Sequence, residues 1–458
     1  MKISLLCLVS FLGLSCARAA STASDANWPQ WRGPDQNGSS STAHPPTVWS
    51  ETENIRWKIK IPGSGTASPI VWGNQVFVET AIPTGKKMAN NSAPANATAN
   101  IAAAPAPNAP RRRGGPGGMR SEKPTEAYQF ALLAMDRQSG KILWQKVARE
   151  ETPHQGHHPT EGSFASSSPV TDGKSVFAYF GSRGLFCYDL AGNVRWEKDL
   201  GKMQTKMDFG EGSSPALFGN TLVVTWDHEG DDFIVAFDKD TGRELWRQAR
   251  DEDTSWATPL IVAHGDKPQV VTAATKKVRS YDLATGKLLW ECGGLTPNAI
   301  PSPVAGDGMV YVTSGFRGSA LLAIRLGRTG DLTGSDAIVW SYGKDTPYVP
   351  SPLLYGGKLY LFASNNNILS SFDAKSGKGL INAERVEGLQ GVYASPLGAG
   401  GHVYLVGRNG VTAVIKPSDQ LEIVAKNKLD DRFDASPAAA GKELFLRGHE
   451  YLYCVAEK

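Results

Sequence analysis

The sequence predicts an all-β protein: an eight-bladed β-propeller of four-stranded antiparallel blades, with the ring closed by an N-terminal strand. Two recurring patterns predict this fold. A Ser/Thr-Pro pair followed by a short apolar strand recurs at eight positions along the chain, and a turn that runs from Asp to Gly and is followed by Trp occurs between these positions. The 458 residues include 49 Gly, 28 Pro and 12 Trp, a composition that suits repeated hairpins better than helices.

The clearest copy of the repeat spans residues 210–246. It begins with Ser214-Pro215 and continues through two apolar strands separated by Gly219-Asn220. A polar loop, a third apolar strand and a fourth strand ending at Trp246 follow. Four short strands joined by turns are typical of one propeller blade.

The Pro of each pair marks the start of one blade. Proline lacks an amide hydrogen and is confined to strand starts and edge strands, so these pairs are expected to head the innermost strands around a central channel. Seven spacings separate the eight prolines, and all but the first are between 41 and 49 residues. The prolines are Pro69, Pro169, Pro215, Pro259, Pro303, Pro352, Pro396 and Pro437.

The first spacing is longer because of residues 83–126. This segment contains an Ala/Asn/Pro tract and a run of Arg and Gly, which cannot bury enough apolar surface to order itself. It is predicted to be a disordered insertion within the propeller.

The Asp-Gly-Trp pattern marks the outer strand of each blade. Asp accepts hydrogen bonds from the amides of its own turn, and Gly adopts the positive φ that the turn needs. The eighth copy stops before an outer strand. The segment that ends at Trp57, by contrast, resembles an outer strand that has no blade of its own. Its capture would close the ring. The four clear copies are 136–144, 189–196, 238–246 and 282–290.

The N-terminus predicts secretion. Residues 1–19 have the shape of a signal peptide, with Lys2, an apolar run and Ala17-Arg18-Ala19. Cys16 also suggests a lipoprotein, but the residues before it, Gly13-Leu14-Ser15, do not match a lipobox, so ordinary signal-peptide cleavage is favoured. We therefore expect a periplasmic or secreted protein with an extended segment at 20–53 and the propeller at 54–458. No other apolar run is long enough to span a bilayer.

Charge and cysteine content narrow the function. The net charge is +3, but without the signal peptide and the insertion the remaining chain is negative, which argues against nucleic-acid binding. Cys187, Cys292 and Cys454 are expected to be unpaired and buried, since Cys187 and Cys454 occupy the same position of two blades that are not adjacent.

The Ser-Pro strand combined with the Asp-Gly-Trp turn resembles the PQQ-like propeller repeat. This repeat is shared by quinoprotein alcohol dehydrogenases and by the outer-membrane assembly scaffold BamB, and the resemblance covers residues 54–458. It implies a fold but only weakly an activity. The dehydrogenases hold a quinone beneath a ring of two adjacent disulfide-linked cysteines, with calcium beside it. This sequence has no adjacent cysteine pair, although Trp256 is available for stacking.

Candidate ligand-binding residues come from one face. In a four-stranded blade, the loops between strands two and three emerge on the same face as the blade-to-blade connections, and here these loops are long and polar. The alternative is that they are solvated and pair with one another. The candidates are His154, His157, His158, Arg183, Asp208, Glu211, Asp227, His228, Glu229, Trp256, Asn298, Arg317, Tyr348, Arg408, Asp434 and His449.

No catalytic residue or metal ligand is predicted. The three histidines of 154–158, approached by 227–229, suggest a zinc site, but their spacing matches no zinc signature, and a hydrogen-bonded cluster is favoured. We expect a binding or assembly scaffold without a cofactor, a monomer whose loop-rich face takes an envelope protein or a small-molecule or glycan ligand. The alternative is a periplasmic oxidoreductase that uses PQQ with calcium, or a metal.

Overall fold

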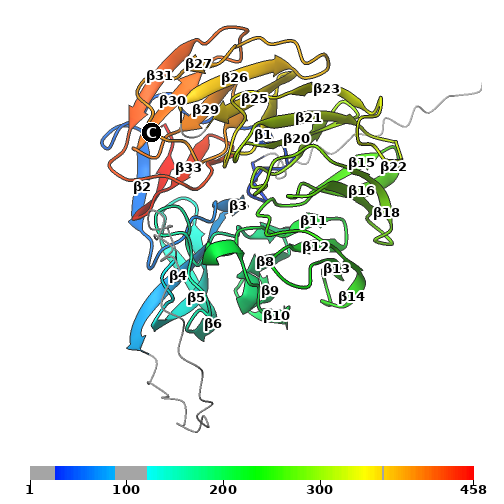
Figure 1. Ribbon diagram of the computed structural model, residues 1–458. Helices are drawn as coiled ribbons and strands as arrows, with labels where there is room; N and C mark the ends of the chain where they lie inside the picture. The colour runs from blue at the N-terminus through cyan, green and yellow to red at the C-terminus, as the bar shows by residue number, and fades with distance from the viewer. Residues whose placement is uncertain (1–25, 88–120, 364–365, 458) are drawn as a thin grey trace, which may run out of the picture.

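The computed structural model describes residues 26–87, 121–363 and 366–457. It confirms the predicted architecture: eight antiparallel sheets arranged as the blades of a ring (Figure 1). The predicted signal peptide lies outside the described residues, as does most of the predicted insertion. No helix in the described ranges is long and apolar enough to cross a membrane.

Each blade is an antiparallel meander that starts at the channel. Every innermost strand begins directly after the Pro of a Ser/Thr-Pro pair, which confirms the predicted strand order. The strands of the first four blades are β3 (Ile70–Trp72), β4 (Gln75–Lys87), β5 (Glu126–Asp136) and β6 (Ile142–Glu151); β7 (Val170–Thr171), β8 (Ser175–Tyr179), β9 (Leu185–Asp189) and β10 (Val194–Lys198); β11 (Ala216–Phe218), β12 (Thr221–Trp226), β13 (Phe233–Asp238) and β14 (Glu244–Ala249); and β15 (Leu260–His264), β16 (Lys267–Thr272), β17 (Val278–Asp282) and β18 (Leu288–Cys292).

The second half of the ring continues the same order, with the last blade completed from the other end of the chain. Its strands are β19 (Val304–Gly306), β20 (Met309–Ser314), β21 (Ala320–Arg325) and β23 (Ile338–Tyr342); β24 (Leu353–Tyr355), β25 (Lys358–Ala363), β26 (Ile368–Asp373) and β27 (Glu384–Arg385); β28 (Leu397–Ala399), β29 (His402–Val406), β30 (Val411–Ile415) and β31 (Ile423–Lys428); and β32 (Ala438–Ala440), β33 (Glu443–Arg447), β34 (Tyr451–Val455) and β2 (Ile55–Lys60).

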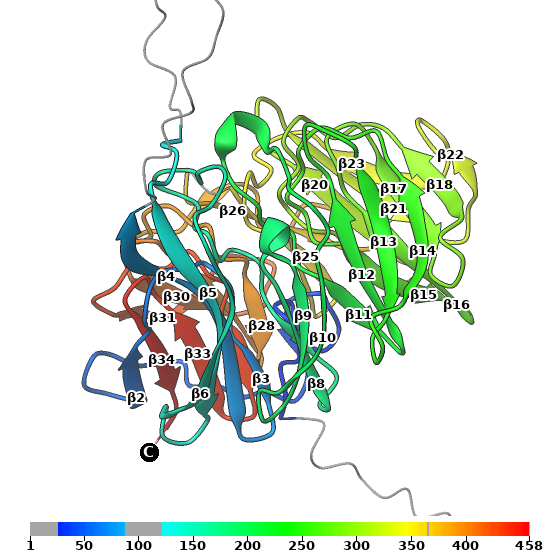
Figure 2. The same ribbon diagram turned by 90° about the horizontal axis from the view of Figure 1, so that it is seen from below.

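The N-terminal strand β2 closes the ring, as predicted. It pairs antiparallel with β34, the last strand of the chain, and forms the outer strand of the eighth blade (Figure 2). A ring closed in this way leaves no blade incomplete at a chain end.

The recurring Trp and Gly residues join neighbouring blades. The indole N–H of Trp144 donates to the carbonyl of Leu190 at 3.1 Å, and a Cβ placed on Gly192 would lie 2.9 Å from the same ring. The Gly is therefore required both by its positive φ and by the tryptophan that covers it. The same docking recurs for Trp57 on Gly140, Trp196 on Gly242, Trp246 on Gly286 and Trp340 on Gly377.

Trp290 departs from this pattern because the fifth blade carries an insertion where its turn would be. The short strand β22 (Gly330–Asp331) of that insertion turns back and pairs with β18 as a fifth strand of the fourth blade. The indole of Trp290 donates to Gln269 of its own blade, at 2.9 Å.

Residues at both ends of the range predicted to be a disordered insertion form strands. β4 continues through Pro83 to Lys87, and Tyr128 on β5 pairs with Pro83. The two ends of the range 83–126 are thus part of a long hairpin of the first blade.

The three cysteines lie in the described part of the chain as free, buried thiols, in agreement with the prediction. Burial raises the pKa of Cys187 to about 11 and that of Cys454 to about 12. They are packing residues of the blades.

Candidate functional site

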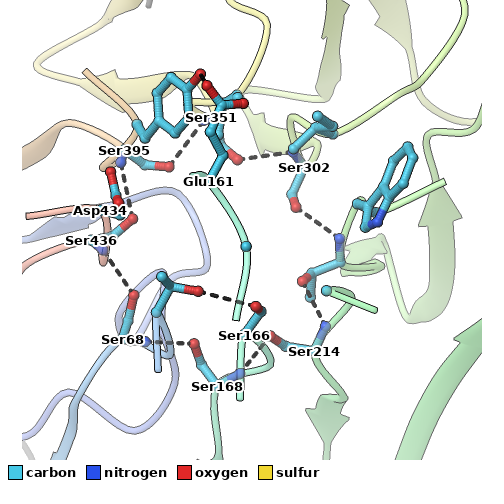
Figure 3. Close-up of a pocket in the computed structure, with 18 of the residues that line it drawn as sticks. Ser68, Glu161, Ser166, Ser168, Ser214, Ser302, Ser351, Ser395, Asp434 and Ser436 are labelled. Atoms are coloured by element: carbon cyan, nitrogen blue, oxygen red, sulfur yellow. Dashed lines mark hydrogen bonds between the residues drawn. The ribbon is translucent and has the colours of Figure 1, made fainter. Parts of the chain in front are cut away.

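A closed ring of side-chain hydrogen bonds surrounds the central channel. At each Ser/Thr-Pro pair, the backbone N–H donates to the hydroxyl of the corresponding residue in the next blade, over 2.8–3.0 Å. The last bond, from Ser436 back to Ser68, completes the circle (Figure 3). The ring members are Ser68, Ser168, Ser214, Thr258, Ser302, Ser351, Ser395 and Ser436.

The segment from Asn27 to Trp49 covers the mouth of the channel on the side away from the long loops. Its backbone bonds Val71 of the first blade, Thr171 of the second and Gly441 of the eighth. Its strand β1 (Ser39–Ser40) pairs with β28 of the seventh blade. The sequence predicted only a segment pinned to the surface, whereas the structure places it across the channel as a floor.

Arg32 anchors this floor. Its guanidinium is buried and donates to the carbonyls of Asn37, Pro352 and Pro396. Burial lowers the pKa of Arg32 to about 9, since no carboxylate among the described residues forms an ion pair with it. Trp31 beside it forms part of the lining of the space above.

A second segment crosses the opposite mouth. It belongs to the connection between the first and second blades, and Figure 3 shows Glu161 and Ser166 within the circle of serines. The backbone of this strap, residues 158–166, bonds Phe209 through His158 on one side. On the other side, Thr160 accepts hydrogen bonds from Arg408 and Arg432 at 2.8 and 2.6 Å. The strap is thereby held at both ends.

Glu161 ties the strap to the seventh blade. The Tyr393 hydroxyl donates to its carboxylate at 2.5 Å, and Arg408 lies 3.6 Å away. Burial, reinforced by this carboxylate, raises the pKa of Tyr393, so the phenol remains a donor.

The floor, the ring and the strap line a cavity of about 200 Å³. Its wall combines the eight ring hydroxyls with aromatic faces and three carboxylates. The carboxylates are Glu161, Glu211 and Asp434, and the aromatic residues are Trp31, Phe209, Trp256, Tyr348 and Tyr393.

Every carboxylate of the wall is already bonded. Glu211 accepts from the backbone and hydroxyl of Ser182, both at 2.6 Å, and from Arg183 at 3.2 Å. Asp434 lies 2.6 Å from Arg408 and 2.8 Å from His449. The cavity therefore carries little uncompensated charge despite its acidic residues.

Of the predicted site residues, His158, Glu211, Trp256, Tyr348 and Asp434 line the cavity. A second group consists of Arg183, Arg408 and His449, which contact these carboxylates from outside.

The other predicted site residues lie away from the cavity. In the third blade, Asp227 forms a buried ion pair with Arg250 at 2.7 Å, Glu229 accepts from Thr254, and His228 accepts from the Gln204 backbone. His154 bonds the Met203 carbonyl, and His157 packs on Phe164. Asp208, Asn298 and Arg317 have positive φ.

The three histidines suggested as zinc ligands have different partners. His154 bonds the Met203 carbonyl, His157 bonds the His158 carbonyl, and the ring of His158 packs on Phe209. In the part of the chain that the structure describes, no three His, Cys, Asp or Glu side chains are grouped as metal ligands.

The sequence-based site lacked Trp31, Glu161, Phe209, Tyr393 and the ring hydroxyls. The ring did have a sequence signal, since a hydroxyl residue precedes all eight prolines. It was assigned to the fold because it recurs.

The fold and its repeats define a PQQ-like β-propeller. A family model described as outer membrane protein assembly factor BamB matches residues 46–224, 129–293 and 191–422, which together cover most of the chain. The chain therefore belongs to this family. No curated protein sequence matches it.

Solved structures share the fold at low sequence identity. BamB from Moraxella catarrhalis has a TM-score of 0.52 and 14% identity, over 71% of this chain and 93% of that one. Quinohemoprotein alcohol dehydrogenase from Comamonas testosteroni has a TM-score of 0.61 and 10% identity, over 96% and 82%. A europium-containing methanol dehydrogenase has 0.58 and 11%, over 92% and 89%. These likenesses concern the fold alone.

Proposed function

We propose that this protein is a binding protein of the cell envelope that recognises its ligand or partner at the loop-rich face. One observation carries the proposal: loops of that face converge on a cavity with aromatic walls and bonded polar groups. Pre-formed concave sites of this kind are typical of ligand binding. The envelope location is supported by the predicted signal peptide and by the family description.

The alternative, a PQQ-dependent oxidoreductase, finds little support in the cavity. Pyrroloquinoline quinone carries three carboxylates, whereas the cavity lining has Glu161, Glu211 and Asp434 and neither Lys nor Arg. The three carboxylates of the quinone would therefore meet no cationic Lys or Arg side chain in the cavity lining. The residues present do not fit this quinone.

The proposed binding can be tested with the small-molecule and macromolecular fractions of a bacterial envelope extract. The midpoint of thermal unfolding is measured with each fraction, because a ligand that binds only the native state raises it. Tyr348→Ala removes a cavity wall, and Tyr342→Ala on the outer strand of the fifth blade is the matched control. We expect one fraction to raise the midpoint for the parent and the control but not for Tyr348→Ala. No shift with either fraction would disprove the binding function.

The oxidoreductase alternative needs its own assay. The protein is incubated with PQQ and calcium, and turnover of alcohols and sugars is followed with an artificial electron acceptor. We expect neither saturable quinone binding nor turnover. Both together would replace the binding proposal with the enzymatic one.

A further inference from the structure

We propose that the cavity binds a small, neutral, polyhydroxylated molecule about the size of one sugar ring or cyclic polyol. This inference rests on the proposed binding function and specifies its ligand. It follows from the hydroxyl ring, the charge balance, the aromatic faces and the volume of the cavity.

The ring hydroxyls provide unused hydrogen-bond donors. Each hydroxyl oxygen accepts one backbone N–H from the neighbouring blade, and within the described residues none of the eight donates a hydrogen bond. A hydroxyl has one proton to donate and two lone pairs, so each ring member keeps a donor and one lone pair. All eight side chains are buried around one cavity. Such a surface matches a ligand rich in oxygen atoms that both accept and donate.

The charge balance favours a neutral ligand. An anion meets no Lys or Arg in the cavity lining. A cation meets carboxylates that already have cationic partners: Glu211 has Arg183, and Asp434 has Arg408, which also lies 3.6 Å from Glu161. Either ion would lose its hydration without gaining a free counter-charge, which costs several kcal/mol per ion. A neutral polyol avoids this cost.

Aromatic faces complete the match. Trp256 is held in place by its indole N–H, which donates to the Gly210 carbonyl at 2.8 Å. Tyr348 stacks on Phe316 with ring centroids 5.2 Å apart. Both rings line the cavity and present apolar surface beside the hydroxyls. The C–H faces of a sugar ring can pack there while its hydroxyl groups bond the ring residues.

The volume of the cavity is compatible with a ligand of one ring. About 200 Å³ is smaller than the roughly 300–1,000 Å³ of pockets for drug-sized ligands. A monosaccharide or a cyclic polyol is of this size.

The experiment uses the full protein and three classes of probe. The neutral probes are hexoses, pentoses and myo-inositol, the cation is choline and the anion is D-glucuronate. Binding is measured by calorimetry and by saturation-transfer NMR. Thr258→Val removes one ring hydroxyl with little change in shape, and Thr258→Ser is the control that keeps it. Both variants are first shown to be folded by circular dichroism and by their unfolding midpoints.

We expect at least one neutral polyol to bind, with affinity reduced about 2- to 10-fold by Thr258→Val, the loss of one hydrogen bond, and little changed by Thr258→Ser. If Thr258→Val does not fold, Tyr348→Ala and its control Tyr342→Ala take its place. Polyol binding that none of the cavity variants weakens would overturn the inference.

Two further outcomes separate this inference from the proposed function. Binding of choline or glucuronate alone, lost in Tyr348→Ala, would overturn the ligand class and leave the binding function standing. Binding of no probe would overturn the inference, while the extract experiment still decides the binding function on its own.

Discussion

The contact between Gly140 and Trp57 gives a sharp test of ring closure. Gly140 belongs to the turn of the first blade, and Trp57 lies on β2, which completes the eighth blade. Gly140 has a φ of +72°, and a Cβ added to it would lie 2.7 Å from Cδ2 of Trp57. The substitution Gly140→Ala therefore strains the backbone and separates the two blades that close the ring.

The magnitude follows from these two effects. A Cβ in left-handed backbone costs about 1–2 kcal/mol. Overpacking against a buried ring costs a further 1–3 kcal/mol, roughly. Gly219 is the matched control, because its φ is +56° and no atom lies within 4 Å of its added Cβ. We expect Gly140→Ala to lower the free energy of unfolding by about 2–5 kcal/mol and Gly219→Ala by about 1–2 kcal/mol.

The assay is urea unfolding followed by tryptophan fluorescence and by circular dichroism. A double-mutant cycle with Trp57→Ala isolates the contact, since Gly140→Ala should cost less once the indole is absent. The coupling energy should be about 1–3 kcal/mol. Equal losses for Gly140→Ala and Gly219→Ala, with no coupling to Trp57, would refute the proposed docking.

Three further predictions concern the interior and the two covers of the channel. Burial raises the pKa of Glu79 well above its usual value of 4.5, so this carboxyl keeps its proton in the native state and stability falls as pH rises above about 4.5. Glu79→Gln should therefore raise the unfolding midpoint more at about pH 8 than at about pH 4 in pH-dependent urea melts, and an equal effect at both would contradict the assignment. Tyr393→Phe removes the hydroxyl that holds Glu161 and should speed amide hydrogen exchange in the strap, with no change in β29 of the same blade; unchanged exchange in the strap would show that this bond does not restrain it. Arg32→Ala leaves buried carbonyls without their donor and should cost about 3–5 kcal/mol in urea unfolding, whereas a loss below about 1 kcal/mol would mean that the floor does not depend on this side chain.

The fold could be predicted because each repeat contains residues whose backbone preferences mark its strand starts and turns. Pro215 and its equivalents mark strand starts, since proline cannot donate to a ladder, and Gly242 and its equivalents mark turns with positive φ. Trp57 without a blade and β34 without an outer strand were enough to predict ring closure. The floor was not predictable in the same way, because Arg32 bonds carbonyls of blades more than 300 residues away in sequence.

The candidate site was predicted only in part. Trp256, Tyr348 and Asp434 line the cavity, but Asp227 turns instead to Arg250 in a buried ion pair. Sequence position indicates which face a loop occupies but not whether its side chain points to the channel or to a neighbouring blade. For the predicted site residues that line the cavity, a role in ligand binding stays a prediction.

The ring hydroxyls were not predicted as site residues, because a residue that recurs in every blade was expected to serve the fold alone. A Ser or Thr recurs at the position of Ser214 in every blade, and for that reason its hydroxyl was assigned to the fold. Rotational repetition around an axis places eight such hydroxyls on one circle, so that a residue with a structural role in each blade becomes part of a binding surface in the whole ring.

The pairing of β2 with β34 has a consequence for folding. The strand β2 is separated from its hydrogen-bonding partner Tyr451–Val455 by all the other blades of the ring. Until those blades are in place, β2 is an unpaired strand edge that can pair with wrong partners. Closure of the ring is thus a non-local step, and contacts of such large sequence separation form slowly.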